Sequence, residues 1–288
     1  MTAFLFYKNL VKKKNAELFI IFAPNCKTMS KKAVANFVVI ENTALNSSNF
    51  LIRLQAQFLL PEVHPGQFVN IEIKNTNEIF LRRPFSIFEV DNEKNILSVI
   101  VKILGRGSKK LTELKENDQI SLVFPLGKGF TYPEKRDKIL LIGGGSGVAP
   151  MLFLAKKSGL SVDNVDIILG ARTSEDLINV SEYSKYGGLH FTTEDGSAGS
   201  KGFVIHHPVF FNNLKNYTKI YACGPDAMMK AVAKEAKKAN IFCEVSLENL
   251  MACGFGVCLC CIEPTTKGNL CVCTEGPVFN INELKWQI

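Results

Sequence analysis

The chain has 288 residues, which is long enough for two ordinary domains and a small third unit. Hydrophobic residues make up 47% of it and charged residues 21%, the balance of a soluble globular protein, so disordered and collagen-like chains are excluded. The net charge of +7 comes from lysines that are scattered along the sequence. Because nucleic-acid binding requires clustered positive charge, no nucleic-acid partner is expected.

The sequence carries no signal for a membrane or for secretion. Its apolar runs are far shorter than the about 20 residues of a membrane span. The run at residues 18–23 is not followed by a small-residue cleavage site. The protein is therefore expected in the cytoplasm. In that reducing compartment its nine cysteines are expected to bind metal or to do redox work rather than to form disulfides.

Residues 1–32 differ from the rest of the chain. They are rich in Phe, Lys and Asn and show neither a helical period nor helix caps. We expect a loosely held N-terminal extension, or a true translation start at Met29. The alternative is an ordinary helix packed on the body of the protein.

Residues 33–132 predict an antiparallel β-barrel. Short runs of β-branched and aromatic residues are separated by Asn, Asp, Gly and Pro at the spacing typical of such barrels. A short helix is expected to begin at Ser108 and to include Leu111 and Leu114. The predicted strands are 37–40, 50–54, 67–71, 85–88 and 97–101.

Residues 133–241 predict a doubly wound α/β domain. The continuous apolar run at 138–142 is typical of a strand buried on both faces, and glycines and an apolar helical stretch follow it. Strands alternating with helices indicate a parallel sheet. The further strands are expected at 165–169, 190–191 and 219–222, and a helix is expected at 227–239.

Residues 242–288 predict a small third unit that is dense in cysteine. Cys253, Cys258 and Cys261 have the spacing C-x4-C-x2-C, and Cys273 follows them. This is the plant-type pattern for a [2Fe–2S] cluster, in which four thiolates hold two irons. The glycines at 254 and 256 are expected to take positive φ angles and to let backbone N–H groups point at the sulfurs.

Two further thiols leave the ligand set open. Cys260 and Cys271 lie beside the predicted ligands and could replace Cys261 or Cys273. A zinc site made of four cysteines is the alternative to the cluster. Such sites usually show two short C-x2–4-C pairs, which this spacing fits poorly.

Two fragments of the barrel region are suited to a diphosphate. Arg83-Pro84-Phe85-Ser86 ends a strand, and Gly105-Arg106-Gly107-Ser108 opens a helix further on. An arginine can grip a diphosphate, and a helix N-terminus behind a small-residue turn offers free amides to it. Taken singly, each has a plainer interpretation, because Arg83 could cap a surface loop and the two glycines could form an ordinary turn.

A glycine-rich loop joins the first buried strand of the α/β domain to its helix. It consists of Gly143, Gly144, Gly145 and Gly147, with Ala149-Pro150 behind them. Glycines here would let the pyrophosphate of a dinucleotide approach the helix N-terminus. The pattern is not the common G-x-G-x-x-G fingerprint.

The order of these motifs resembles the ferredoxin–NADP reductase superfamily. Arg-Pro-Phe-Ser comes first, then Gly-x-Gly-Ser, and then the form G-G-G-x-G-x-A-P at 143–150. The resemblance implies that Arg83, Pro84, Phe85 and Ser86 flank the isoalloxazine of FAD and that Gly107 and Ser108 hold its pyrophosphate. It also implies that Ile100, Val101 and Lys102 run alongside the flavin. Phe85 stands where many relatives have Tyr, and Ser108 where Thr is common.

The same resemblance implies the position of the nicotinamide. Cys223, Gly224 and Pro225 form the turn that lies beside the nicotinamide ring in the superfamily, which makes Cys223 the candidate catalytic residue. A buried small side chain is the alternative interpretation of Cys223. The superfamily reads the adenosine ribose at the positions of Glu194 and Asp195. A carboxylate accepts hydrogen bonds from ribose hydroxyls but repels a 2′-phosphate, so NAD is predicted, with Asp195 as a contact. Either carboxylate could instead be a solvated turn residue.

All three modules in this order resemble the electron-transfer subunits of the NAD-dependent (class 1B) dihydroorotate dehydrogenases. The resemblance runs from about residue 34 to the end and includes 125–130, 246–248 and 276–279. In that family the fourth cluster ligand lies just before a Gly-Pro-Val-Phe turn, which implies Cys273 rather than Cys271.

The family resemblance implies a partner and a function. The partner is an FMN-containing catalytic subunit that oxidises dihydroorotate in pyrimidine biosynthesis, assembled as a heterotetramer of two of each subunit. Electrons would pass from its FMN through the [2Fe–2S] cluster and FAD to NAD, because FAD can exchange electrons singly or in pairs. The alternatives are reductase subunits of sulfide dehydrogenase, of NADH-dependent ferredoxin–NADP oxidoreductase or of anaerobic sulfite reductase. A further alternative, which is not an enzyme, is a zinc-stabilised binding module without redox function.

Overall fold

The computed structural model describes residues 19–20, 32–74, 78–178 and 180–288. The predictions for the N-terminal extension, the start at Met29 and the alternative N-terminal helix lie outside the described residues, apart from residue 32 and β1 (Phe19–Ile20), which pairs with the edge of the barrel. No helix in the described part of the chain is long and apolar enough to cross a membrane.

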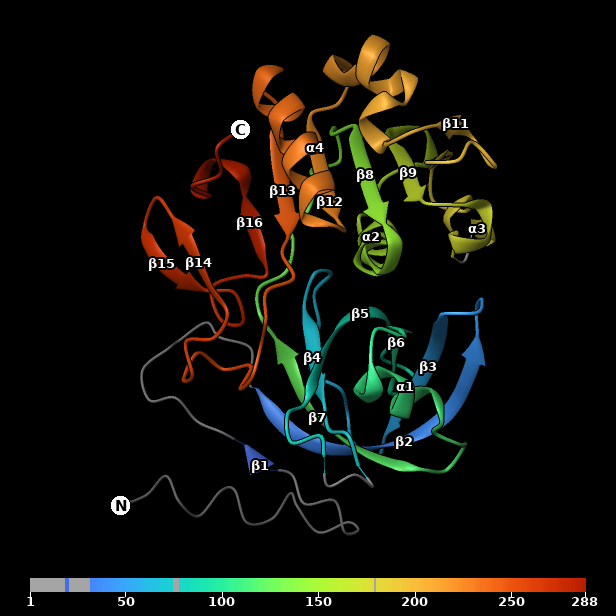
Figure 1. Cartoon of the computed structure of the whole chain (residues 1–288), viewed down its shortest axis with the longest axis vertical. Coiled ribbons are helices and arrows are strands. Elements are labelled where there is room, and N and C mark those ends of the chain that lie inside the picture. Colours follow the sequence, from blue (N-terminus) through green and yellow to red (C-terminus); the bar gives the residue numbers. More distant parts are fainter. Residues whose placement is uncertain (1–18, 21–31, 75–77, 179) are drawn as a thin grey trace.

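The first domain is a closed antiparallel barrel, at the bottom of Figure 1. The strand order is β2-β3-β6-β5-β4-β7, and β2 pairs with β7 to close it. Inward-facing apolar side chains fill it, with the rings of Phe37 and Phe124 packed edge to face at 5.0 Å. Its strands are β2 (Ala33–Ala44), β3 (Asn49–Ala56), β4 (Phe68–Ile71), β5 (Arg83–Asp91), β6 (Ile96–Lys102) and β7 (Gln119–Leu126).

The five predicted barrel strands overlap β2 to β6, whereas β7 was not predicted. Pro125 lies within β7, and a proline usually argues against a strand interior. The predicted helix exists as α1 (Arg106–Thr112). It begins two residues before Ser108 and ends before Leu114, because Gly105 is its N-cap and the chain turns at Glu113.

The second domain is a sheet with the order β11-β10-β9-β8-β12-β13-β16. All neighbouring strands are parallel except β16, which runs antiparallel to β13. The predicted strands fall within β8, β9, β10 and β12. The strands are β8 (Ile139–Gly144), β9 (Val165–Ala171), β10 (Gly188–Thr193), β11 (Ser200–Lys201), β12 (Lys219–Cys223), β13 (Phe242–Ser246) and β16 (Val278–Asn280).

Two helices cover opposite faces of this sheet. Alternate residues of the buried strand β8 point to opposite sides, so that Ile139 and Leu141 pack with α2 (Val148–Lys157), and Leu140 and Ile142 pack with α4 (Asp226–Lys238). The helix predicted at 227–239 is thus confirmed as α4. A four-residue helix, α3 (Val180–Tyr183), follows β9.

The C-terminal unit is tied to both domains. Its hairpin consists of β14 (Ile262–Thr265) and β15 (Gly268–Cys271), and its last strand, β16, joins the α/β sheet. Pro277 forms an isolated β-bridge with Lys128, which follows the barrel strand β7 in the sequence. The cysteine-rich tail is therefore packed into the rest of the molecule.

The order of the strands reverses between β8 and β12, since β9 to β11 follow on one side and β12 and β13 on the other. Ligands of open α/β sheets bind at such a switch point, outside the carboxyl ends of the strands. In Figure 1 the arrowheads of β8, β9 and β13 point towards the barrel. Helix α2 also contacts the barrel strand β5, where Lys156 pairs with Glu89 at 2.6 Å. The binding edge of the sheet therefore faces the barrel.

Candidate functional site

A cavity of about 630 Å³, here called the barrel cleft, lies between the two domains. Its walls come from β5, β6 and α1 of the barrel, from the start of α2 and from the segment 246–251. It therefore brings together two motifs that are well separated in the sequence. The residues predicted to hold FAD that line this cleft are Arg83, Pro84, Phe85, Ser86, Ile100, Lys102, Gly107 and Ser108.

Val101 differs from the other predicted flavin residues. Ile100 and Lys102 line the cleft, but Val101 lies between them on the strand and its side chain is buried in the barrel core. This follows from the alternation of side chains along a strand. Val101 therefore does not line the cleft.

Arg83 lies beside the start of α1 because residue 107 has no side chain. A Cβ atom at Gly107 would stand 3.1 Å from Nε of Arg83. The guanidinium donates to the carbonyl of Leu81 at 2.7 Å, which fixes its direction. Its neighbour Arg82 instead donates to the carbonyl and hydroxyl of Ser121 on β7, at 2.8 and 3.0 Å. The two arginines thus have different roles, and Arg83 is the one whose charge is available in the cleft.

Ser108 caps the helix that it was predicted to open. Its hydroxyl accepts hydrogen bonds from the backbone N–H groups of Leu104 and Gly105 at 2.8 and 3.1 Å, and it donates to the carbonyl of Gly105 at 3.1 Å. This hydroxyl therefore holds the turn that leads into α1.

A second cavity of about 420 Å³, here called the sheet cleft, lies at the carboxyl ends of β8, β9 and β10. Lys102 lines this cleft as well as the barrel cleft, so the two cavities meet at that residue. The residues predicted to hold NAD that line the sheet cleft are Gly144, Gly145 and Pro225. Those that do not line it are Gly143, Gly147, Gly224, Asp195 and Cys223.

The glycines outside the cleft allow two loops to pack against each other. A Cβ atom at Gly147 would lie 2.3 Å from the carbonyl oxygen of Cys223 and 2.6 Å from the backbone nitrogen of Gly224. Gly224 has a φ of +154°, which few other residues adopt. A Cβ atom at Gly143 would lie 2.8 Å from Cα of Val148. The glycine loop after β8 and the turn after β12 therefore depend on each other for position.

Cys223 is fully buried behind the two clefts. Burial raises the pKa of its thiol well above the usual value, and the charge of Glu248 raises it further. The thiol is thus protonated at neutral pH and is not a nucleophile. Glu248 lines the barrel cleft. Burial raises the pKa of Glu248, and the positive charge of Lys102 lowers it in part.

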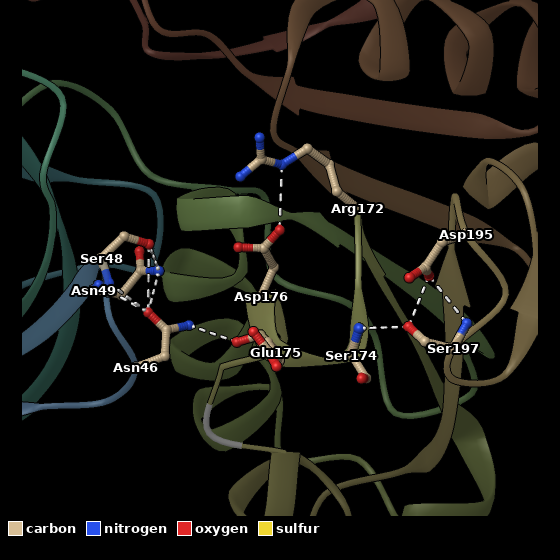
Figure 2. Close-up of polar contacts among 9 residues, drawn as sticks. All are labelled: Asn46, Ser48, Asn49, Arg172, Ser174, Glu175, Asp176, Asp195 and Ser197. Carbon is tan, nitrogen blue, oxygen red and sulfur yellow. Dashed lines mark hydrogen bonds and ion pairs between the residues drawn. The ribbon is translucent and has the colours of Figure 1, made fainter.

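Charged side chains gather at the end of the sheet cleft near β9 and β10. Arg172 and Glu194 both line the cleft, together with Asp176, whose Oδ2 accepts from Nε of Arg172 at 3.2 Å. Figure 2 shows this pair and, apart from it, Asp195, whose carboxylate turns to Ser197. Asp195 accepts from the hydroxyl and the backbone N–H of Ser197 at 2.7 and 3.0 Å. The hydroxyl bond lowers the pKa of Asp195 more than any other contact.

Among the residues of the sheet cleft that the sequence analysis missed, three have side chains suited to a ligand. Phe203 lines it with an exposed ring, and Asn49 and Thr192 each carry a buried side-chain oxygen without a hydrogen-bond partner. Unpaired buried oxygens are uncommon, and each one calls for an explanation, such as a polar ligand that binds there. Asn49 belongs to the barrel, so no pattern within residues 133–241 could have indicated it.

The cysteine loop has the geometry of a sulfur-binding loop. Gly254 and Gly256 have φ angles of +83° and +82°, which confirms the prediction. The backbone N–H of Gly256 donates to the sulfur of Cys273 at 3.1 Å, and that of Phe255 to the sulfur of Cys253 at 3.4 Å. Burial alone would raise the pKa of Cys253, but hydrogen bonds from backbone N–H groups outweigh it and lower the pKa to about 6. The loop therefore points backbone N–H groups at the sulfurs of Cys253 and Cys273.

The four predicted ligands lie in two pairs. Hydrogen bonding joins Cys253 to Cys258 and Cys261 to Cys273. Among the described residues, no three His, Cys, Asp or Glu side chains converge in the way that the ligands of a single metal ion do. A [2Fe–2S] cluster needs a pair of ligands at each iron, whereas a zinc ion needs all four around one point. Two pairs of thiols can supply the two ligands that each iron of a [2Fe–2S] cluster needs.

Comparison with protein families assigns each part of the chain. Residues 35–132 match the oxidoreductase FAD-binding domain, and residues 141–234 match the oxidoreductase NAD-binding domain. Residues 248–285 match the iron–sulfur cluster binding domain of dihydroorotate dehydrogenase B. These matches confirm the predicted fold class and the predicted cofactors FAD, NAD and an iron–sulfur cluster.

Curated relatives share nearly the whole chain. The "dihydroorotate dehydrogenase B (NAD(+)), electron transfer subunit" of Fusobacterium nucleatum is 35% identical over 259 residues, which are 88% of this chain and 98% of the relative. The protein of the same name from Clostridium acetobutylicum is 38% identical and covers 85% of this chain and 95% of the relative.

Solved structures show the same architecture. A chain of the NADH-dependent reduced ferredoxin–NADP oxidoreductase superposes with a TM-score of 0.76 at 29% identity, covering 87% of this chain and 90% of that one. The ferredoxin reductase of carbazole 1,9a-dioxygenase superposes with a TM-score of 0.64 at 22% identity, covering 73% of this chain and 67% of that one. The second likeness supports the fold alone.

Proposed function

The chain belongs to the family of electron transfer subunits of dihydroorotate dehydrogenase B (NAD(+)), and we propose that it passes electrons from a dihydroorotate-oxidising catalytic subunit to NAD. One observation carries the proposal. The barrel cleft and the sheet cleft meet at Lys102, and Met251, which lines the barrel cleft, lies two residues before the first cysteine of the loop. The barrel cleft, the sheet cleft and the cysteine loop therefore lie next to one another within one chain.

The barrel cleft is proposed to hold FAD. Arg83 and the start of α1 offer positive charge and N–H groups to its pyrophosphate, and Gly107 leaves the room that this requires. Pro84, Phe85 and Ser86 with Ile100 and Lys102 line the remaining length, while Ser108 holds the turn. When bound, FAD supplies the exchange between single electrons and a hydride.

The sheet cleft is proposed to hold NAD. Gly144 and Gly145 leave the backbone open at the switch point of the sheet, and Lys102 supplies positive charge beside Gly145. Gly143, Gly147, Gly224 and Pro225 shape the loops, and Cys223 supports them from behind rather than acting as a nucleophile. The unpaired oxygens of Asn49 and Thr192 support a polar ligand in this cleft.

The thiolates of Cys253, Cys258, Cys261 and Cys273 are proposed as the ligands of a [2Fe–2S] cluster. Cys273 rather than Cys271 receives the N–H of Gly256, which supports the choice between them. The cysteine loop also exposes apolar side chains, with Leu250 85% and Val257 78% exposed. Exposed apolar side chains beside a redox centre suit a protein partner. We infer that this partner is the FMN-containing catalytic subunit, in a cytoplasmic heterotetramer of two of each.

A second candidate function has a specific observation in its favour. The solved NADH-dependent reduced ferredoxin–NADP oxidoreductase is 29% identical to this chain over most of its length. A reductase subunit of that kind would accept electrons from reduced ferredoxin instead of dihydroorotate.

The test begins with the anaerobically purified chain. We expect about one FAD and about two irons per chain. Cys258→Ser should lose the iron, whereas Cys260→Ser, which removes an exposed neighbouring thiol, should keep it. Co-expression with the catalytic subunit should then yield NAD reduction that depends on dihydroorotate. A preparation without flavin and iron, or a complex that responds to reduced ferredoxin and not to dihydroorotate, would contradict the proposal.

A further inference from the structure

The sheet cleft carries four charged side chains among the described residues, and they lie in two groups. Lys102 stands beside the glycine loop, with its Nζ 3.7 Å from the position of a Cβ at Gly145. Arg172, Asp176 and Glu194 stand at the ends of β9 and β10. In nucleotide-binding sheets, the end of the second strand is where the adenosine ribose is distinguished, by a carboxylate for NAD or by an arginine for NADP. This end of the cleft holds both kinds of group.

The guanidinium of Arg172 is held by Asp176 through one of its nitrogens. Its Nε donates to Asp176 at 3.2 Å, and the Asp176 side chain is only 27% exposed while that of Arg172 is 73% exposed. The carboxylate is therefore the fixed member of the pair and the guanidinium the movable one. With Glu194 on the same wall, two carboxylates face one guanidinium, so the local charge is negative.

The short turn that carries Asp176 is held from two sides. The turn η3 (Ser174–Asp176) receives a hydrogen bond from the barrel, where Nδ2 of Asn46 donates to the carbonyl of Glu175 at 3.0 Å. On the other side the backbone N–H of Ser174 donates to the hydroxyl of Ser197 at 2.7 Å. Figure 2 shows both contacts around the Arg172–Asp176 pair. The position of the carboxylate is thus set by the fold rather than by the arginine.

We propose that the Arg172–Asp176 ion pair sets the choice of coenzyme, since Asp176 holds Nε of Arg172 and offsets the charge of the guanidinium that would otherwise bind a 2′-phosphate. Asp176 and Glu194 together repel that phosphate, and a ribose with a free 2′-hydroxyl is accepted. This inference rests on the proposed function, in which the sheet cleft binds a nicotinamide dinucleotide. The carboxylate that selects the coenzyme is then Asp176, and not Asp195 as predicted from the sequence, because Asp195 bonds to Ser197 outside the cleft.

The test measures nucleotide binding by calorimetric titration of the full chain loaded with its flavin and cluster, at low ionic strength. The probes are 5′-AMP and adenosine 2′,5′-bisphosphate, which differ only in the 2′-phosphate, with NAD+ and NADP+ beside them. Asp176→Asn should raise the affinity for the bisphosphate about tenfold, the effect of one charge-assisted hydrogen bond. The affinity for 5′-AMP should change by less than about threefold, the scale of an exposed ion pair. Adding Arg172→Gln to Asp176→Asn should abolish the gain.

Two more variants keep the test decisive. Asp163→Asn removes the same charge from a turn that lines neither cleft and should change nothing. Glu194→Gln leaves η3 untouched and should raise bisphosphate affinity about threefold by removing repulsion.

The proposal is overturned if neither Asp176→Asn nor Glu194→Gln gains affinity for the bisphosphate while 5′-AMP still binds. It is also overturned if Asp163→Asn or Asp195→Asn gains as much, or if the gain survives Arg172→Gln. A wild-type chain that binds neither 5′-AMP nor NAD+ overturns the proposed function and this inference together.

Discussion

The contact between the glycine loop and the turn after β12 makes Gly147→Ala a sharp test of the site. Gly147 has φ and ψ angles of −65° and −7°, which suit any residue, so alanine brings no backbone strain. Its Cβ would, however, lie 2.3 Å from the carbonyl oxygen and 2.4 Å from the carbonyl carbon of Cys223. Comfortable contacts need about 3.5 Å, so one of the two loops must shift by about 1 Å. Both atoms belong to the backbone and cannot rotate away.

Overpacking of this kind costs about 1–3 kcal/mol. Because the obstacle is backbone at the end of a fully buried strand, we expect the upper part of that range, about 2–3 kcal/mol. That corresponds to about 30- to 150-fold in the folding equilibrium. The displaced turn should also weaken the binding of NAD+. Urea denaturation followed by circular dichroism measures the first effect, and calorimetric titration measures the second.

Gly144→Ala is the matched control for stability. A Cβ atom there would meet the sulfur of Met228 at 2.6 Å, at the flexible end of a side chain that can move aside, and Cδ of Pro225 at 3.0 Å, which requires only a small shift. Its cost should stay below about 1 kcal/mol. The reasoning is refuted if Gly147→Ala is as stable as the parent chain, or if Gly144→Ala costs as much.

Other predictions concern the rest of the molecule. Ser108→Ala should lower the free energy of unfolding by about 1 kcal/mol, because two backbone N–H groups lose their acceptor. It should also speed the release of flavin, which visible absorbance measures. Rescue by Ser108→Thr would support this prediction, and an unchanged rate of release would contradict it. Iron analysis should show that Cys271→Ser keeps the cluster, whereas Cys273→Ser loses it; the reverse result would exchange the two assignments. Burial alone would raise the pKa of Asp166, but its hydrogen bonds with His190 and Tyr217 outweigh burial and lower this pKa below the ordinary value of 3.8. Its stabilising effect is therefore complete above that pH and lost as the pH falls through the lowered pKa. Asp166→Asn should cost about 1–2 kcal/mol at pH 7 and flatten the acid limb of a pH–stability curve, and an unaltered limb would contradict this.

The cysteine and glycine motifs could be predicted from sequence because their chemistry is local. The spacing of Cys253, Cys258 and Cys261 within one loop fixes which sulfurs can approach one another. The positive φ angles of Gly254 and Gly256 follow from that tight loop. The alternation of buried strands and helices was equally readable, since each signal lies within a few residues of sequence.

Other features could not be read because they depend on distant partners. Asp195 and Asp176 are both acidic turn residues with local partners, but the sheet cleft, which Asp176 lines and Asp195 does not, is formed by segments that are far apart in the sequence. Asn49 reaches the sheet cleft from the barrel, across a domain boundary that no local pattern crosses. The strand β16 lies about thirty residues beyond β13 and is recruited to the sheet by pairing with it.

The C-terminal segment contacts both other domains, and this has a consequence for protein engineering. Its last strand extends the α/β sheet, and residues 246–251 with Pro277 form one side of the barrel cleft. A chain cut before the cysteines would therefore not be a simple two-domain reductase, because it would lack Pro277 from the wall of the barrel cleft and would leave β13 with a bare edge. Chimaeras that exchange this tail between relatives should be joined so that β16 and the wall residues move together.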